Sequence, residues 1–277
     1  MNFYDSQLQE NTVQHTLCIP LWGRKIATEK LPHIFPDFDA KRIIDELGVD
    51  LSNKLIYKMQ YVWVNCFVRQ YNLAWEIENY LKTHPRATVV ELGAGLSCLR
   101  RQMMNETNPW YCLDMENVIN LREKHIPKGS KEKNIVCDLN DYSWFEKIDF
   151  NPDDGIVFTA GGLFYYFEEE QVKNLFIAMS EYFKGGMITF DAVNPTGLKF
   201  VNMEVKMAGN ETKSFFSLKD PKSEIEAWSE NIINVSEKEY INGYLKHGYK
   251  QGITTKISAW LMKKFHWSFM IHAEFKR

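Results

Sequence analysis

The apolar residues of the chain repeat with two different periods, and the period changes near residue 86. From residue 55 to residue 81 they recur every three or four positions, which predicts one long helix or two joined helices. The stretch before it contains three prolines and predicts an irregular segment with one helix over 40–47, stopped by Gly48. We therefore expect residues 1–85 to form a helical N-terminal arm packed on the core.

After residue 86, short apolar runs alternate with helical patterns. Strands are predicted at 88–92, 110–114, 134–138, 155–160 and 186–191, and helices at 118–125 and 168–183. Such alternation is typical of a parallel sheet whose strands are joined by right-handed crossovers.

The segment 196–229 interrupts this alternation directly after the fifth predicted strand. We expect it to be a cap that folds over the open end of the sheet. It would bury its large apolar side chains there, which are Phe200, Met203, Met207, Phe215, Phe216 and Trp228.

The C-terminal part resumes the alternation. A strand is expected over 231–235, and Ser236 with Glu239 has the spacing of a capping box that opens a helix to about His247. A further helix is expected over 255–265, and alternating polarity over 267–275 predicts a final antiparallel strand. The predicted class is α/β, a Rossmann-like and mostly parallel sheet with an antiparallel C-terminal strand, in one domain over 86–277.

Composition narrows the range of functions. Hydrophobic residues make up 45% and charged residues 25%, which is ordinary for a globular chain. The net charge of −3 argues against a nucleic-acid-binding protein. The five cysteines are odd in number and form no Cys-x-x-Cys pair, so we expect free thiols in the cytoplasm. No signal peptide, membrane span or metal-binding histidine pattern is visible, so neither a membrane nor a metal is expected.

A glycine-rich turn follows the first predicted strand. In Glu91-Leu92-Gly93-Ala94-Gly95 the glycines let a ligand approach the backbone closely. A nicotinamide-binding turn would have a third glycine where this chain has Cys98. Glu91 at the strand end suits a ligand with a cationic amino-acid end better than a pyrophosphate.

Two further acids follow the second and third predicted strands. Asp114 lies 19 residues after Gly95 (114 − 95), where a carboxylate accepts from ribose hydroxyls, and Met115 is assigned to the same site. Asp138 can accept from an adenine amino group while Leu139 packs on the ring. Taken together with Glu91, these acids suggest S-adenosylmethionine rather than NAD, and an NAD-dependent oxidoreductase is the alternative.

At this point the chain resembles a known family, the leucine carboxyl methyltransferases, and most closely its tetracenomycin-type polyketide O-methyltransferase branch. The resemblance runs from about Trp22 to Asn194 and is strongest from Arg69 to Arg122. It rests on His84-Pro85, on the Gly93-Ala94-Gly95-Leu96 turn and on the segment from Trp110 to Arg122. It implies methyl transfer from S-adenosyl-L-methionine on a Rossmann-like methyltransferase sheet, and it implies that Arg69 holds the methionyl carboxylate.

The chain departs from this family at two places. Ser97, Cys98 and Leu99 stand where the family usually has Asp-Thr-Arg, and Gly161 stands where it usually has a glutamate. Gly161 is still assigned to the cofactor site. Because of these departures, a cofactor-binding relic without turnover is a second alternative.

An aromatic run, Phe164-Tyr165-Tyr166-Phe167, follows the fourth predicted strand, at the end where open α/β sheets bind ligands. We assign Phe164, Tyr165 and Tyr166 to the pocket of a small-molecule acceptor. A carboxylate acceptor needs no base, whereas a hydroxyl acceptor needs one, with Tyr165, Tyr166 or His266 as candidates. The predicted function is O-methylation of a small-molecule carboxylate or hydroxyl, with no catalytic residue assigned.

Overall fold

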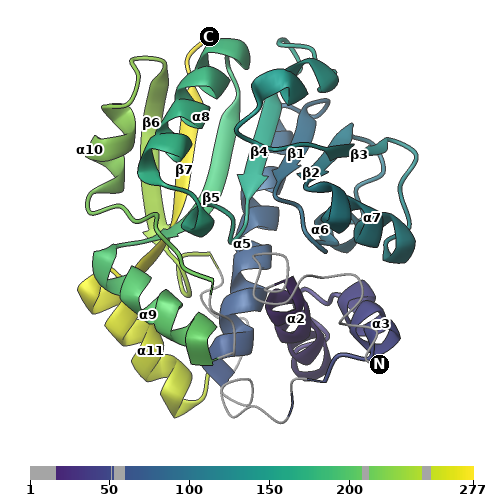
Figure 1. Cartoon of the computed structure of the whole chain (residues 1–277), viewed down its shortest axis with the longest axis vertical. Helices are drawn as coiled ribbons and strands as arrows, with labels where there is room; N and C mark the ends of the chain where they lie inside the picture. Colours follow the sequence, from purple (N-terminus) through teal and green to yellow (C-terminus); the bar gives the residue numbers. More distant parts are fainter. Residues whose placement is uncertain (1–16, 51, 53–59, 208–211, 245–250) are drawn as a thin grey trace.

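The computed structural model describes residues 17–50, 52, 60–207, 212–244 and 251–277. Within this part of the chain seven strands form one sheet in the order β3-β2-β1-β4-β5-β7-β6 (Figure 1). The strands are β1 (Thr88–Leu92), β2 (Trp110–Asp114), β3 (Glu132–Val136), β4 (Ile156–Ala160), β5 (Met187–Val193), β6 (Ile232–Glu239) and β7 (Ser268–Phe275). Neighbouring strands from β3 to β5 are parallel, and β7 is antiparallel to both of its neighbours. The predicted fold class is confirmed.

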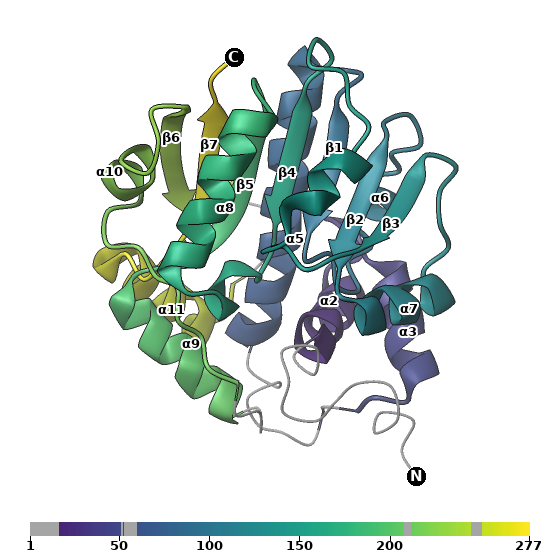
Figure 2. The same ribbon diagram turned by 45° about the horizontal axis from the view of Figure 1, so that its top comes forward.

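Helices cover both faces of this sheet. They are α2 (Cys18–Lys30), α3 (Phe38–Leu47), α5 (Gln60–Thr83), α6 (Leu99–Gln102), α7 (Glu116–His125), α8 (Glu169–Tyr182), α9 (Pro195–Met207), α10 (Pro221–Glu226) and α11 (Ile253–Phe265), with the 3-10 turns η2 (Tyr142–Lys147) and η3 (Phe164–Tyr166). Helix α5 packs against β4 and β5 on one face, and α8 crosses the other (Figures 1 and 2). In the described part of the chain, no helix combines the length and the apolar character that crossing a membrane requires.

Local sequence explains several helix ends. The Asp37 side chain accepts from the Ala40 N–H at 2.8 Å and starts α3, and Gly48 ends this helix with a φ of 63°. Glu168 and Gln171 form a capping box at the start of α8. The predicted helices over 40–47 and 168–183 are therefore confirmed, with ends that shift by one or two residues.

The prediction of a helix from Ser236 was wrong. Residues Ser236 to Glu239 continue β6 and pair with β7, from Ser236 opposite His272 to Glu239 opposite Phe269. Asn234 has a φ of 54°, and the register shifts between Ile233 and Ser236. This irregularity carries the strand past the apparent helix start, because pairing with a central strand outweighs a local capping pattern. Residues 245–250 of the predicted helix lie outside the described residues.

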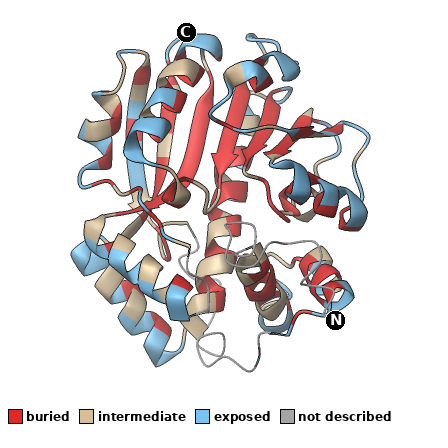
Figure 3. Ribbon diagram, viewed as in Figure 1, coloured by how far each residue is buried: buried red, intermediate tan, exposed pale blue. Residues whose placement is uncertain are grey.

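Aromatic side chains fill the face of the sheet under α8. Phe164, Phe176 and Phe190 are fully buried, and their ring centroids lie 5.2 to 5.6 Å apart in edge-on pairs. Aromatic pairs prefer this arrangement. Figure 3 shows the sheet as the most continuously buried part of the molecule.

The segment 196–229 divides into two parts with different roles. Its first part, α9, lies beyond the carboxyl end of β5, beside α11 (Figure 1). Its second part packs on the sheet, because Phe216 and Ile225 are buried in the core and α10 contacts β6. The expectation that the segment buries its large apolar groups is correct for Phe216. It is wrong for four of the others, which are exposed: Phe200, Met203, Met207 and Phe215.

We expect Phe176→Ala to lower the free energy of unfolding by about 3–5 kcal/mol, since it opens a cavity among rings that cannot collapse. Urea denaturation followed by tryptophan fluorescence measures this loss. Phe38→Ala is the matched control, because the Phe38 ring is 68% exposed and its loss should cost less than about 0.5 kcal/mol. Equal losses in the two variants would contradict the assignment of Phe176 to the core.

Candidate functional site

Two adjoining cavities lie at the carboxyl edge of the parallel strands. The larger has a volume of about 450 Å³, within the range of small-molecule sites, and the smaller has about 70 Å³. Both are lined by Arg69, Gly93 and Gly161, so they meet beneath the turn that follows β1. All ten residues predicted to bind the cofactor line one or both of these cavities. That they contact the cofactor is still a prediction.

The glycine turn lies between the two cavities. Gly93 and Gly95 have φ values of 58° and 50°, which favour glycine. A Cβ atom on Gly93 would lie 2.4 Å from the Leu163 Cδ1 atom, so a side chain does not fit there. Ala94 is buried, and its N–H donates to the carbonyl of Leu113 on β2 at 2.9 Å. The turn is thus fixed by its own backbone conformation and by β2.

Asp114 ends β2 and faces the larger cavity. One carboxylate oxygen accepts from the Gly95 N–H at 2.7 Å and the other from the Met115 N–H at 2.8 Å. Burial raises the pKa of Asp114, and the two N–H donors oppose that rise. Each oxygen keeps a further lone pair, so the carboxylate can still accept from a pair of hydroxyls. Met115 lines the same cavity and is 46% exposed.

Asp138 and Leu139 form the far end of the larger cavity. Strand β3 ends at Val136, two residues before Asp138, so the predicted strand over 134–138 was placed too late. Asp138 is exposed and accepts from the side chain and the N–H of Asn140, both at 2.9 Å. Leu139 is buried and presents an apolar surface beside it.

Arg69 reaches the cavities from α5 and is held by a buried acid. Its Nε atom lies 2.9 Å from a carboxylate oxygen of Asp191 on β5, and this carboxylate is fully buried. Asp191 also accepts from the Gly162 N–H at 2.6 Å and from the Tyr165 hydroxyl at 2.9 Å. Burial by itself lowers the pKa of Arg69, but the charge of Asp191 together with the neighbouring Tyr240, Tyr165 and Cys66 side chains raises it well above its ordinary value. Arg69 is therefore a fixed cation in the walls of both cavities.

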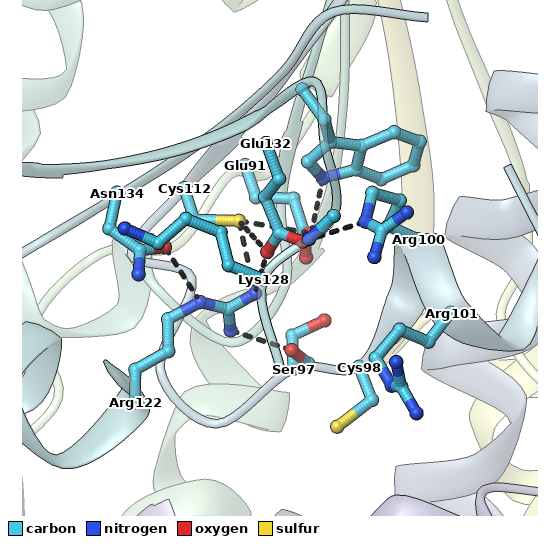
Figure 4. Close-up of polar contacts among 12 residues, drawn as sticks. Glu91, Ser97, Cys98, Arg100, Arg101, Cys112, Arg122, Lys128, Glu132 and Asn134 are labelled. Carbon is cyan, nitrogen blue, oxygen red and sulfur yellow. Dashed lines mark hydrogen bonds and ion pairs between the residues drawn. The ribbon is translucent and has the colours of Figure 1, made fainter. Parts of the chain in front are cut away.

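Glu91 faces the smaller cavity, where its carboxylate accepts from the Trp110 indole N–H at 2.7 Å. Behind it lies a buried polar cluster, which Figure 4 shows between α7 and the sheet. Arg122 in this cluster pairs with Glu132 at 3.1 Å and donates to the Ser97 carbonyl at 2.6 Å and the Gly95 carbonyl at 3.2 Å. The glycine turn is thus supported from below by a buried cation.

Ser97, Cys98 and Leu99, which depart from the family pattern, have structural roles in this chain. The Ser97 hydroxyl accepts from the Gln70 amide at 3.0 Å and from the Leu99 N–H at 3.2 Å. Cys98 and Leu99 are buried, and burial raises the pKa of the Cys98 thiol well above its ordinary value.

The glycine at position 161, where the family usually has a glutamate, is explained by the space around it. A Cβ atom there would lie 2.9 Å from the Leu73 Cδ1 atom and 3.3 Å from the Arg69 Cδ atom. A glutamate at this position would therefore require the Leu73 and Arg69 side chains to shift.

The aromatic run divides between core and cavity. Phe164 is fully buried, packs on Phe176 and Phe190, and is not brought to either cavity. Tyr165 and Tyr166 both line the larger cavity. Burial and the neighbouring Asp191 charge raise the pKa of Tyr165 well above its ordinary value.

The sequence reasoning missed two acids at this site. Asp191 ends the strand predicted over 186–191, so the rule that singled out Glu91 and Asp114 at strand ends also selects it. Glu204 on α9 lines the larger cavity. The feature of the sequence that could have indicated it is an acidic residue within an amphipathic helical segment. Over the described residues, no group of three or more His, Cys, Asp or Glu side chains is arranged to hold a metal ion.

The sheet order and strand directions define the class of fold, which is that of S-adenosylmethionine-dependent methyltransferases. The magnesium protoporphyrin IX methyltransferase of Synechocystis, solved with S-adenosylhomocysteine, matches with a TM-score of 0.51 and 10% identity over 86% of this chain and 93% of that chain. The plantazolicin methyltransferase, also solved with S-adenosylhomocysteine, matches with a TM-score of 0.52 and 13% identity over 95% of this chain and 99% of that chain.

Among curated proteins the chain has a distant homologue. It is 24% identical to the tetracenomycin polyketide synthesis O-methyltransferase of Streptomyces glaucescens. The aligned 189 residues cover 68% of this chain and 68% of that protein. No protein-family model matches the chain.

We expect Arg122→Met to lower the free energy of unfolding by about 3 kcal/mol, because it leaves Glu132 with one partner fewer in a buried site. Urea denaturation measures the loss. Arg42→Met is the matched control, since Arg42 forms ion pairs on the surface of α3 and its replacement should cost less than about 1 kcal/mol. A loss at Arg122 no larger than that at Arg42 would contradict the supporting role of Arg122.

Proposed function

We propose that this protein is an S-adenosyl-L-methionine-dependent O-methyltransferase that acts on a small molecule. The observation that carries the proposal is the shared location of the predicted cofactor residues. Acids at the ends of β1 and β2 and just beyond β3 line two adjoining cavities, together with a glycine turn and a fixed arginine.

The polar groups that line these cavities match the parts of the cofactor one by one. Asp114 accepts from the ribose hydroxyls, Asp138 accepts from the adenine amino group, and Leu139 packs on the ring. Arg69 holds the methionyl carboxylate, and Glu91 faces the amino group across the smaller cavity. A planar guanidinium suits a carboxylate, which supports the role of Arg69. When bound, the cofactor supplies a methyl group that its sulfonium already activates, so the chain mainly supplies proximity and orientation.

The sheet separates this proposal from the dinucleotide alternative. The sheet of a dinucleotide-binding protein usually has parallel strands in the order 3-2-1-4-5-6. In this protein the antiparallel strand β7 lies between β5 and β6. Cys98 also occupies the place of the third fingerprint glycine.

We further propose membership of the leucine carboxyl methyltransferase family, in its tetracenomycin-type branch. The segment from Arg69 to Arg122 and the similarity to the tetracenomycin enzyme support this assignment. Residues 1–85 are then an arm that carries Arg69, and residues 86–277 are the methyltransferase domain with a cap over 196–229. None of the five cysteines, all of which lie in the described part of the chain, forms a disulfide, and a cytoplasmic location is still a prediction from the sequence.

We expect the wild-type protein to bind S-adenosylhomocysteine and not NAD in calorimetric titrations. Asp114→Ala should weaken the S-adenosylhomocysteine affinity about tenfold or more, because it removes charge-assisted hydrogen bonds worth about 1.5–3 kcal/mol. Asp153→Ala, in an exposed loop far from the cavities, is the matched control and should bind normally. Binding of NAD in place of S-adenosylhomocysteine would overturn the proposed function, and unchanged binding by a folded Asp114→Ala variant would remove Asp114 from the site.

Arg69→Ala should weaken S-adenosylhomocysteine binding about tenfold more than 5′-methylthioadenosine binding, because only the first ligand carries the amino-acid carboxylate. Comparing two ligands on one variant cancels the effect of leaving Asp191 without its cation. Lys82→Ala, at the exposed end of α5, should affect neither ligand. Equal losses for both ligands would mean that Arg69 acts through the shape of the site and not through the carboxylate.

A further inference from the structure

The part of the larger cavity beyond β5 has an apolar wall. Its lining includes Val193, Phe200, Val201, Val205, Met262 and Trp267. The Phe200 and Trp267 rings pack together with centroids 4.4 Å apart. Among the described lining residues contributed by α9, α11 and β7, the one charged side chain is Glu204. Placing a carboxylate in an apolar wall costs free energy unless hydrogen-bond donors or a cation compensate its charge. We therefore ask which group Glu204 binds.

A second helix holds Glu204 in place. The Tyr61 hydroxyl on α5 donates to one of its carboxylate oxygens. Burial raises the pKa of Glu204, while the Tyr61 hydrogen bond and the Arg69 charge oppose that rise. The same burial and the adjacent carboxylate raise the pKa of Tyr61, so Tyr61 stays a donor. Among the described residues none is hydrogen-bonded to the second carboxylate oxygen, which can therefore accept from a ligand.

The position of Glu204 separates it from the adenosine groups. Asp114 and Asp138 follow β2 and β3 on one side of β1, whereas α9 follows β5 on the other side (Figure 1). Arg69 and Cys66 on α5 line the same cavity. Glu204 therefore faces the side of the cavity that the proposed cofactor leaves to the acceptor.

We infer that the methyl acceptor is an apolar, ring-containing molecule with a hydroxyl group, and that Glu204 is the base that receives the hydroxyl proton. This inference rests on the proposed methyl transfer and names its substrate class. A carboxylate on the acceptor would be repelled by the negative charge of Glu204 in an apolar pocket, so binding of such an acceptor is disfavoured. A hydroxyl instead donates to Glu204, and the ring-lined wall accommodates the rest of the molecule.

The step balances in atoms and charge. The acceptor oxygen forms a bond to the methyl carbon while the bond from that carbon to sulfur breaks. The electron pair of the broken bond goes to sulfur, which becomes the neutral thioether of S-adenosylhomocysteine. The hydroxyl proton goes to the Glu204 carboxylate, so one positive and one negative charge disappear together. Tyr61 is a positioning residue in this step, because it touches Glu204 and not the acceptor.

The test uses two probes of the same size, 1-naphthol and 1-naphthoate, titrated calorimetrically into the protein saturated with S-adenosylhomocysteine. We expect the wild-type protein to prefer 1-naphthol about tenfold or more, and Glu204→Gln to lose most of this preference by gaining affinity for 1-naphthoate. Tyr61→Phe leaves the Glu204 carboxyl group in place and should keep more of the preference than Glu204→Gln does. Lys206→Gln, on the exposed side of α9, is the matched control and should leave it unchanged.

Three results would overturn the inference and leave the proposed function standing. They are an equal or reversed preference in the wild-type protein, a preference unchanged by Glu204→Gln, and binding of neither probe by protein that binds S-adenosylhomocysteine. Failure of the wild-type protein to bind S-adenosylhomocysteine would instead overturn the proposed function itself.

The role of Glu204 as base is tested by transfer of tritium from methyl-labelled S-adenosylmethionine to the same probes. We expect the methyl ether of 1-naphthol as product, with kcat about a hundredfold lower in Glu204→Gln and KM changed far less. Tyr61→Phe should lower kcat by a smaller factor. Methyl 1-naphthoate as the main product, or selective binding of 1-naphthol without transfer, would exclude Glu204 as the base.

Discussion

The fully buried carboxylate of Asp191 determines how three parts of the chain meet at the carboxyl edge of the sheet. A carboxylate without access to water must be paired and hydrogen-bonded, because an unpaired buried charge is strongly destabilising. Its partners here are the Arg69 guanidinium on α5, the Gly162 N–H after β4 and the Tyr165 hydroxyl. The position of Arg69 in the walls of both cavities is thus a consequence of a pairing inside the sheet.

A second buried charge fixes the opposite side of the site. Arg122 pairs with Glu132 and donates to two carbonyls of the chain around the glycine turn. The Gly95 N–H of the turn donates to Asp114, which lines the larger cavity. Two buried ion pairs, one on each side of β1, therefore hold the cavity walls before any ligand arrives, which is the preorganisation that methyl transfer by proximity requires.

The two sides of the larger cavity differ in chemistry. The side near β2 and β3 presents carboxylates at the ends of strands, and the side near α9 and α11 presents apolar side chains with one carboxylate among them. The first pattern suits a polar nucleoside, and the second suits an apolar molecule with one hydrogen-bond donor. Gly161 lies where the two cavities meet, and a larger residue there would press on the Leu73 and Arg69 side chains.

The sequence alone determined the features that depend on residues close together along the chain. The strands at 88–92 and 110–114 follow from continuous apolar runs, and Asp114 follows from its position at a strand end, because parallel strands bring their carboxyl ends to one edge. Only the tertiary structure decided the pairings between distant residues. Ser236 looked like a helix start, but pairing with β7 made it part of a strand. Phe164 looked like a cavity residue, but the direction of its turn placed it in the core. The Glu204 carboxylate accepts from Tyr61, a residue 143 positions away, which no local pattern could indicate.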